Sequence, residues 1–104
     1  MSCGLSYAVE LLTGRWKVNI IWNISNDVNR FGQLKRNIPA MSEKMLSQRL
    51  KDLEKEGLIS REDFKTIPPH VEYHLTDAGK ALIPVLEGLC QWGTKIREST
   101  ELAY

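Results

Sequence analysis

The stretch from Met41 to Gly57 places apolar side chains on one side of a helix and polar side chains on the other. At about 100° per residue, three leucines stack in one narrow stripe and the polar residues gather opposite them. The stripe is Leu46, Leu50 and Leu53, and the opposite side holds Lys44, Ser47, Gln48, Lys51 and Lys55. Ser42 is placed to cap the first turn, with Met41 and Leu46 in position to contact each other across the cap. The chain must therefore supply a core for one face of this helix and leave the cationic face outside.

The rest of the chain predicts a small domain that is mainly helical and has one β-hairpin. Apolar residues recur at helical spacing in four further segments, and two short alternating segments predict strands. The predicted helices cover residues 4–13, 15–24, 31–37 and 76–99, and the predicted strands cover 58–64 and 71–75. The helix 15–24 is apolar around most of its circumference, which indicates the centre of the fold, and Pro84 is expected to kink or restart the last helix. A chain of 104 residues has room for one domain, residues 1–104.

A short helix, a turn of about four residues and a basic helix are the outline of a helix-turn-helix motif, and a hairpin directly after it is a wing. The formal charge of the chain is only +1, but residues 30–51 hold six cations against one acid, a net of +5. A local patch of this kind attracts a polyanion even when the whole molecule is near neutral. The pattern favours double-stranded DNA as the partner over a second possibility, a winged-helix module that binds only protein.

Other classes of protein have little support in this sequence. No apolar run approaches 18 residues, and the segment from Met1 to Gly4 lacks the features of a secretion signal, so we expect a cytoplasmic protein without a membrane partner. His70 and His74 are four residues apart on a strand, about 13 Å, and are not expected to share a metal. Two cysteines are too few for a disulfide framework or a zinc site, and no phosphate-binding loop or nucleophile motif is present. The sequence therefore predicts no catalytic residue, no metal and no cofactor.

Short motifs at specific positions add to this outline. They are Cys3 before the first helix, Gly14-Arg15-Trp16, Arg30-Phe31, Leu34-Lys35-Arg36, Ile38-Pro39, Lys44-Met45-Leu46, Arg49-Leu50, the run from Pro68 to Tyr73, Leu75-Thr76, Gly79 and Trp92-Gly93. In this order they resemble the HxlR-type winged helix-turn-helix regulators, a bacterial and archaeal family related in architecture to the MarR-like repressors. The resemblance covers nearly the whole chain. It implies a transcriptional regulator that binds an inverted-repeat operator as a homodimer, with two recognition helices in successive major grooves.

The predicted DNA contacts come from the basic helix, the helix before it and the hairpin. The groove-facing set is Lys44, Ser47, Gln48 and Lys51, in which a glutamine suits an adenine edge and the lysines suit guanine or phosphate. Arg49 lies about 60° from the leucine stripe, so it either reaches DNA or lays its stem on the core and pairs with an acid such as Glu43. Phosphate contacts are predicted for Arg30, Lys35 and Arg36, and contacts of the wing with the flanking minor groove or its phosphates for Lys65 and His70.

The first and last helices are predicted to hold the dimer, because their apolar faces exceed what one small domain buries. The predicted interface residues are Leu5, Val9, Leu86, Leu89, Trp92 and Ile96. Cys3 stands at the amino end of a helix, where the dipole favours a reactive thiolate. The resembled family often senses an oxidant or an electrophile there, so Cys3 is the candidate redox-sensing residue, and Cys90 is expected to be a small buried apolar residue. The alternative is a regulator that responds to a small molecule held non-covalently between the first and last helices.

Overall fold

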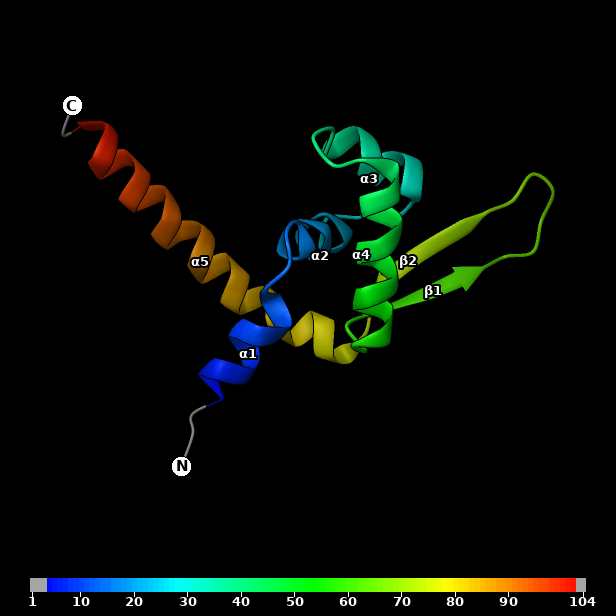
Figure 1. Cartoon of the computed structure of the whole chain (residues 1–104), viewed down its shortest axis with the longest axis horizontal. Helices are drawn as coiled ribbons and strands as arrows, with labels where there is room; N and C mark the ends of the chain where they lie inside the picture. Colours follow the sequence, from blue (N-terminus) through cyan, green and yellow to red (C-terminus); the bar gives the residue numbers. More distant parts are fainter. Residues whose placement is uncertain (1–3, 103–104) are drawn as a thin grey trace.

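Helix α2 (Lys17–Ser25) lies at the centre of the computed structural model, which describes residues 4–102. Its Ile20 and Ile21 are fully buried, as its predicted central position requires. The other elements are α1 (Leu5–Leu12), α3 (Phe31–Asn37), α4 (Glu43–Lys55), β1 (Ile59–Asp63), β2 (Val71–Leu75) and α5 (Asp77–Leu102) (Figure 1). The predicted fold class, mainly helical with one small β-hairpin, is therefore confirmed.

One hydrophobic core joins α2, α3 and α4 to the base of the hairpin. The leucine stripe of α4 is buried against α2, since Leu46, Leu50 and Leu53 are each no more than 2% exposed. Leu34 of α3 and Met41 of the following turn fill the same core. The leucine stripe that the sequence predicts to face a core is thus the face by which α4 packs on the domain.

The hairpin of β1 and β2 is a two-stranded antiparallel sheet whose register pairs Ile59 with Leu75 and Glu62 with Glu72. Its inner end is anchored to the domain by Leu58 and Ile59, which are buried, and by a hydrogen bond from the Tyr73 N–H to the Asn29 carbonyl (2.8 Å). Its outer end extends away from the helices (Figure 1). Because α5 projects in the opposite direction, the chain reaches 54 Å along its longest axis.

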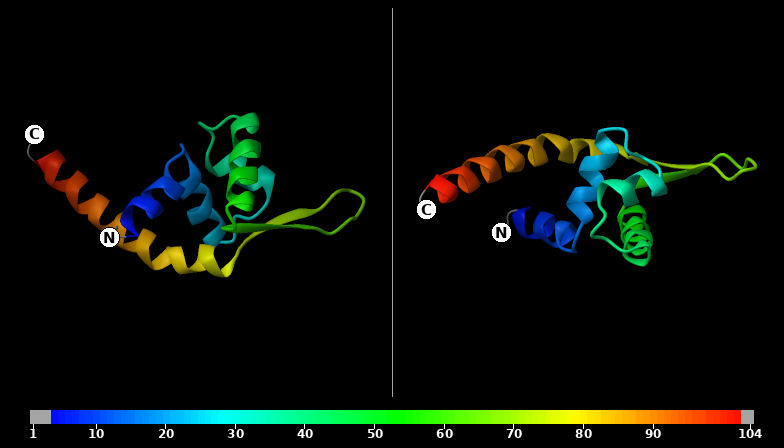
Figure 2. Two further views of the ribbon diagram at one scale, coloured as in Figure 1. Left: turned by 60° about the horizontal axis from the view of Figure 1, so that its bottom comes forward. Right: turned by 90° about the horizontal axis from the view of Figure 1, so that it is seen from above.

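Helix α5 begins tightly packed and ends away from the domain. Thr76 caps it, accepting a hydrogen bond from the Gly79 N–H (3.2 Å), as predicted. Gly79 lies so close to the hairpin that a Cβ there would be 2.2 Å from the Leu58 carbonyl oxygen. Of the two outcomes expected at Pro84, a kink or a restart, the restart is absent, because α5 is continuous through this residue, and the helix bends along its length (Figure 2). None of the helices within residues 4–102 is long and apolar enough to span a bilayer.

Two predictions for α5 are wrong in this structure. Leu86 was assigned to a dimer interface, but it is only 3% exposed, because it turns inward and packs in the core of its own chain. Cys90 was expected to be buried, but it is exposed. It lies one turn beyond Leu86 at the edge of the helix, beside a hollow that is also lined by Trp22 and Leu89.

Candidate nucleic-acid interface

The turn between α3 and α4 fixes where α4 begins. Ser42 accepts a hydrogen bond from the Met45 N–H (3.1 Å), which satisfies one of the amide groups left without a partner at a helix start. Met41 and Leu46 flank this cap and are both buried, which agrees with the predicted hydrophobic contact across it. The first turn of α4 is therefore held at both its polar and its apolar side, and the side chains after it have a fixed direction.

The outer face of α4 presents the predicted groove-facing set. Lys44, Gln48 and Lys51 are exposed, and Ser47 is half-buried. Arg49 is also half-buried, and its guanidinium pairs with the Asp52 carboxylate at 2.5 Å. This agrees with an arginine that lies toward the core and pairs with an acid, but the acid is Asp52 and not Glu43.

Asp52 is a residue of this surface that the sequence reasoning missed. One of its carboxylate oxygens accepts a hydrogen bond from the Gln48 side-chain amide (2.9 Å), and the other is paired with Arg49. The hydrogen bond from Gln48, followed by the hydrogen bond and charge of Arg49, lowers the pKa of Asp52 below its ordinary value against the opposing effect of burial. Spacings of three and four residues on a helix bring side chains together, so the pattern from residue 48 to 52 was the available signal. Asp52 restricts the rotamers of both neighbours before any ligand arrives.

A shallow hollow lies along α3. Arg30 and Arg36 line a hollow of about 240 Å³ together with Gly32 and Gln33. The Gln33 side chain accepts hydrogen bonds from the Asn29 and Arg30 N–H groups (3.2 and 3.3 Å), which orders the start of α3. Two guanidinium groups at the rim of one hollow are suited to an anion of phosphate size.

Lys35 is directed to the other side of the turn, where its ammonium donates to the Pro39 carbonyl (3.2 Å). It therefore supports the turn that leads into α4 and lies apart from the hollow between Arg30 and Arg36. The Lys35 side chain is half-buried in this position.

A second hollow, of about 410 Å³, connects α4 with the hairpin. It is lined by Ser47, Lys51, Glu54, Arg61 and Tyr73. Arg61 is a cation that the sequence reasoning did not select, although strand alternation places residues 59, 61 and 63 on one face. Through this hollow, Lys51 of the predicted groove-facing set and Arg61 of the wing border the same surface.

The two predicted wing contacts have different surroundings. Lys65 is exposed at the turn of the hairpin, in a left-handed backbone conformation (φ 54°), and its N–H is bound by the Asp63 side chain (2.9 Å). The His70 ring packs against Phe64, and its Nε2 lies 2.7 Å from a carboxylate oxygen of Glu72. Lys65 can therefore reach a ligand directly, whereas His70 already has a partner within the wing.

The residues predicted for a dimer interface are largely uncovered. The exposed fractions are 67% for Leu5, 52% for Val9, 50% for Leu89, 63% for Trp92 and 48% for Ile96. Helix α1 has no buried residue. Cys3, the candidate redox-sensing residue, lies outside the described residues.

The family of the chain follows from a match over most of its length. A model of the HxlR-like helix-turn-helix family matches residues 11–101. The chain belongs to this family. It is therefore a DNA-binding regulator of the helix-turn-helix type, and the winged-helix prediction is confirmed.

Related proteins agree with this assignment to the HxlR family. The HTH-type transcriptional regulator YkvN of Bacillus subtilis (strain 168) is 44% identical over 92 residues, which cover 88% of this chain and 78% of YkvN. The reduced form of the redox regulator HypR aligns with a TM-score of 0.87 at 29% identity, covering 98% of this chain and 100% of HypR. The reduced form of the transcriptional regulator YodB from B. subtilis aligns with a TM-score of 0.77 at 36% identity, covering 88% and 91% of the two chains.

Proposed function

We propose that the chain controls transcription as a homodimer on an inverted-repeat operator, with α4 of each copy in a major groove. The observation that carries this proposal is the outer face of α4, where Lys44, Gln48 and Lys51 are exposed, and the preceding helix adds the exposed cations Arg30 and Arg36. In this arrangement Gln48 reads a base edge, and the lysines contact guanine or phosphate. The α3 cations position the protein on the backbone, because phosphate contacts fix register without reading sequence.

The wing and the turn complete the proposed contact with DNA. Lys65 and Arg61 extend the positive surface from α4 toward the flanking minor groove, and His70 supports the hairpin from which they project. Arg49 acts through Asp52 on the orientation of Gln48 and does not itself read a base.

The proposed contacts predict two different results in a binding experiment. On a duplex selected from a random pool, Gln48→Ala should lose about 1 to 3 kcal/mol on the selected sequence and little on random DNA. Arg36→Ala, which removes an exposed cation of α3, should weaken both about equally and reduce the salt slope by about one. Fluorescence anisotropy over a range of salt concentrations measures both effects. Identical behaviour of the two variants on selected and random duplexes would contradict the assignment of the groove face.

The proposed dimer is supported by apolar residues that the single chain leaves uncovered on α1 and on the outer half of α5. Leu89→Asp should give monomers that bind the operator poorly, because a charge would be buried in the contact between copies. Gln91→Asp is the matched control, since it places the same charge about 200° around the helix. Sedimentation and a gel shift test the pair. A fully dimeric Leu89→Asp protein with normal operator binding would refute this arrangement.

Sensing of oxidants or electrophiles by Cys3 is the finer part of the proposal. HypR is described as a redox regulator, and the solved structures that resemble this chain include reduced and oxidised HypR and reduced and diamide-treated YodB. A modified thiol next to α1 would alter the contact between copies, and thus the spacing of the two α4 helices. A gel shift with diamide or a quinone, with mass spectrometry of the thiols, should show loss or gain of operator affinity in the natural chain and none in Cys3→Ser. Equal responses would leave Cys3 without this role.

An apolar hollow favours the second candidate, a regulator that responds to a small molecule. The hollow measures about 300 Å³ and lies between α1 and α5, with lining residues Ala8, Leu11, Leu12, Leu58, Ala78, Ala81, Leu82 and Val85. Its walls suit an apolar ligand bound without a covalent bond. In that case Ala81→Trp should mimic the ligand by filling the hollow, and the response to an inducer should persist in Cys3→Ser.

A further inference from the structure

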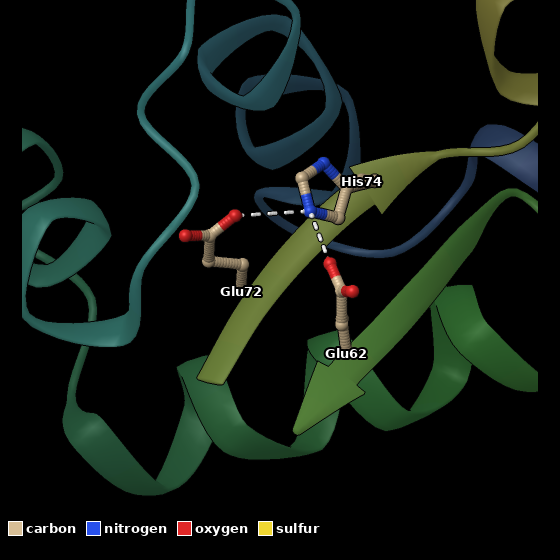
Figure 3. A group of neighbouring side chains, drawn as sticks. All are labelled: Glu62, Glu72 and His74. Carbon is tan, nitrogen blue, oxygen red and sulfur yellow. Dashed lines mark ion pairs between the residues drawn. The ribbon is translucent and has the colours of Figure 1, made fainter. Parts of the chain in front are cut away.

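Three side chains from the two strands of the wing meet on one face of the hairpin. They are Glu62 of β1 and Glu72 and His74 of β2 (Figure 3). The Nε2 atom of His74 lies 3.1 Å from a Glu72 carboxylate oxygen and 3.4 Å from a Glu62 carboxylate oxygen. Since Arg61 and Tyr73 alternate with these residues, they lie on the opposite face, toward α4. The group is therefore separate from the proposed groove-facing set.

Within the described chain, the two carboxylates of this group are paired only with His70 and His74. Glu62 and Glu72 are directly opposite each other in the strand register, and like charges in that position destabilise a hairpin. Within residues 4–102, neither carboxylate forms an ion pair with a lysine or an arginine. His74 is the shared partner of both, although its Nε2 is shielded from solvent and makes no hydrogen bond within the described chain. The Nε2 atom is directed between two carboxylate oxygens at ion-pair distance but is hydrogen-bonded to neither, which is the geometry of a ligand set.

We propose that His74 Nε2, Glu62 Oε1 and Glu72 Oε1 bind a divalent transition-metal ion, with zinc as the ion to test. Ligand atoms at about 2.0 to 2.1 Å from a tetrahedral zinc lie roughly 3.3 Å from one another. The two separations from His74, 3.1 and 3.4 Å, already match this spacing. All three donor atoms lie within 4.8 Å, so the carboxylates need only a small rotation to close the site. Water takes the fourth position, because one imidazole and two carboxylates leave the site open.

His70 has a supporting role in this site. Its Nε2 holds the second oxygen of Glu72 at 2.7 Å, which leaves the first oxygen directed at His74. The His70 ring is itself fixed against Phe64, with ring centroids 4.4 Å apart. Residues that orient a ligand in this way commonly change metal affinity by about 10- to 100-fold when they are replaced. His70 is thus a positioning residue for the proposed site.

A bound ion would change the wing in two ways. It would link β1 to β2 beyond the inner end of the hairpin, and it would replace the net negative charge of two carboxylates with a neutral centre. The second effect matters for DNA binding, because a wing that carries uncompensated carboxylates is repelled by phosphates. The proposed metal site does not depend on the proposed function, whereas the expected effect of the metal on DNA binding does depend on it.

Isothermal titration with zinc tests the site in the full chain. A Cys3→Ser, Cys90→Ser background is used together with the natural chain, because thiolates are strong zinc ligands. At about pH 7.5, above the ordinary histidine pKa of about 6.5, we expect one zinc ion per chain. Affinity should fall at least about tenfold in Glu62→Gln and in His74→Gln, and measurably in His70→Gln. Glu87→Gln, at an exposed glutamate of α5, is the matched control and should bind zinc normally.

Two further measurements separate the possible outcomes. Circular dichroism checks that each variant is folded, and the ring nitrogen signals of His74 in an NMR spectrum should shift when zinc is added to the natural chain. Absence of binding, or binding that Glu62→Gln and His74→Gln leave unchanged, would overturn the proposed site. If zinc binds, and the variants lose zinc affinity as expected, but zinc leaves operator affinity unchanged, the metal site is supported and its effect on DNA binding is refuted.

Discussion

Lys17 joins the carboxyl ends of two helices, and its replacement tests how the recognition helix is fixed. The side chain is only 7% exposed, and its ammonium donates to the Leu11 carbonyl at the end of α1 (3.1 Å) and to Glu56 just beyond α4 (2.5 Å). Glu56 is less enclosed, with a quarter of its side chain exposed. The two ends of this ion pair are thus buried to different degrees, and removing one or the other should have different consequences.

Replacing Glu56 by alanine should destabilise the domain more than replacing Lys17 by methionine. Glu56→Ala leaves a buried ammonium without its counter-charge, and loss of one partner of a buried pair costs about 3 to 5 kcal/mol. We expect the lower end, about 3 kcal/mol, because the Leu11 carbonyl still accepts a hydrogen bond from Lys17. Lys17→Met keeps the packing of the aliphatic stem and lets Glu56 turn to water, so it should cost about 1 to 2 kcal/mol, mainly for the unpaired carbonyl.

Urea and thermal unfolding of the two single variants and the double variant measure these changes in the free energy of unfolding. All proteins are compared at one concentration, because association between copies adds to stability. In a domain of this size, about 3 kcal/mol corresponds to a fall in Tm of at least roughly 12 °C. The double variant should resemble Lys17→Met, because no buried charge is left unpaired, so the sum of the two single effects should exceed the double effect by about 3 kcal/mol. Additive effects, or a larger loss for Lys17→Met, would refute the view that Lys17 is held by Glu56.

Two other substitutions have expected outcomes of opposite kinds. Gly79→Ala should destabilise the domain by about 3 kcal/mol in urea unfolding, because its Cβ would meet the Leu58 carbonyl. Gly88→Ala on the same helix places a Cβ with nothing within 4 Å and should stabilise the domain by about 0.5 to 1 kcal/mol. Equal effects would contradict the close approach of α5 to the hairpin. The pKa of Asp52 is lowered in the folded chain, so its contribution to stability is present above the ordinary value of 3.8 and is lost as the pH falls through the folded pKa. Unfolding between about pH 6 and pH 3 should therefore show a steeper acid loss in the natural chain than in Asp52→Asn, and parallel curves would contradict the role of Asp52.

Local chemistry is enough to predict several boundaries of this fold. Helix α3 and strand β2 begin and end at the predicted residues, and Ser42 and Thr76 cap their helices as expected. Helix α2 begins two residues later than predicted, because Trp16 has a left-handed backbone conformation (φ 77°) that no pattern of apolar residues reveals. The same reversal of the chain directs Lys17 toward the end of α1. The spacing of apolar residues therefore predicts helix α2 and its central position, but it does not predict the turn that leads into the helix.

The features that could not be predicted depend on residues far apart in the chain. Lys17 and Glu56 are separated by 39 positions, so the buried ion pair has no local signature. The group of Glu62, Glu72 and His74 becomes visible only when the strand register is known, because Glu62 is placed opposite Glu72 by pairing across the hairpin. Sequence spacing measures distance along one strand alone, so it relates His74 to His70 but not to Glu62 across the hairpin.

In the proposed dimer, the length of α5 makes it a lever arm between the wing and the second copy of the chain. Its 26 residues correspond to about 39 Å, and its start is clamped where Gly79 meets the Leu58 carbonyl. A tilt of about 5° at the clamped end moves the far end by roughly 3 Å, by the geometry of a rod of that length. Grooves that follow each other at about 34 Å tolerate little displacement of a rigid dimer. In the proposed dimer, a very small rearrangement near Leu58, or between the distal halves of the two α5 helices, would therefore be sufficient to move the two α4 helices out of step with DNA.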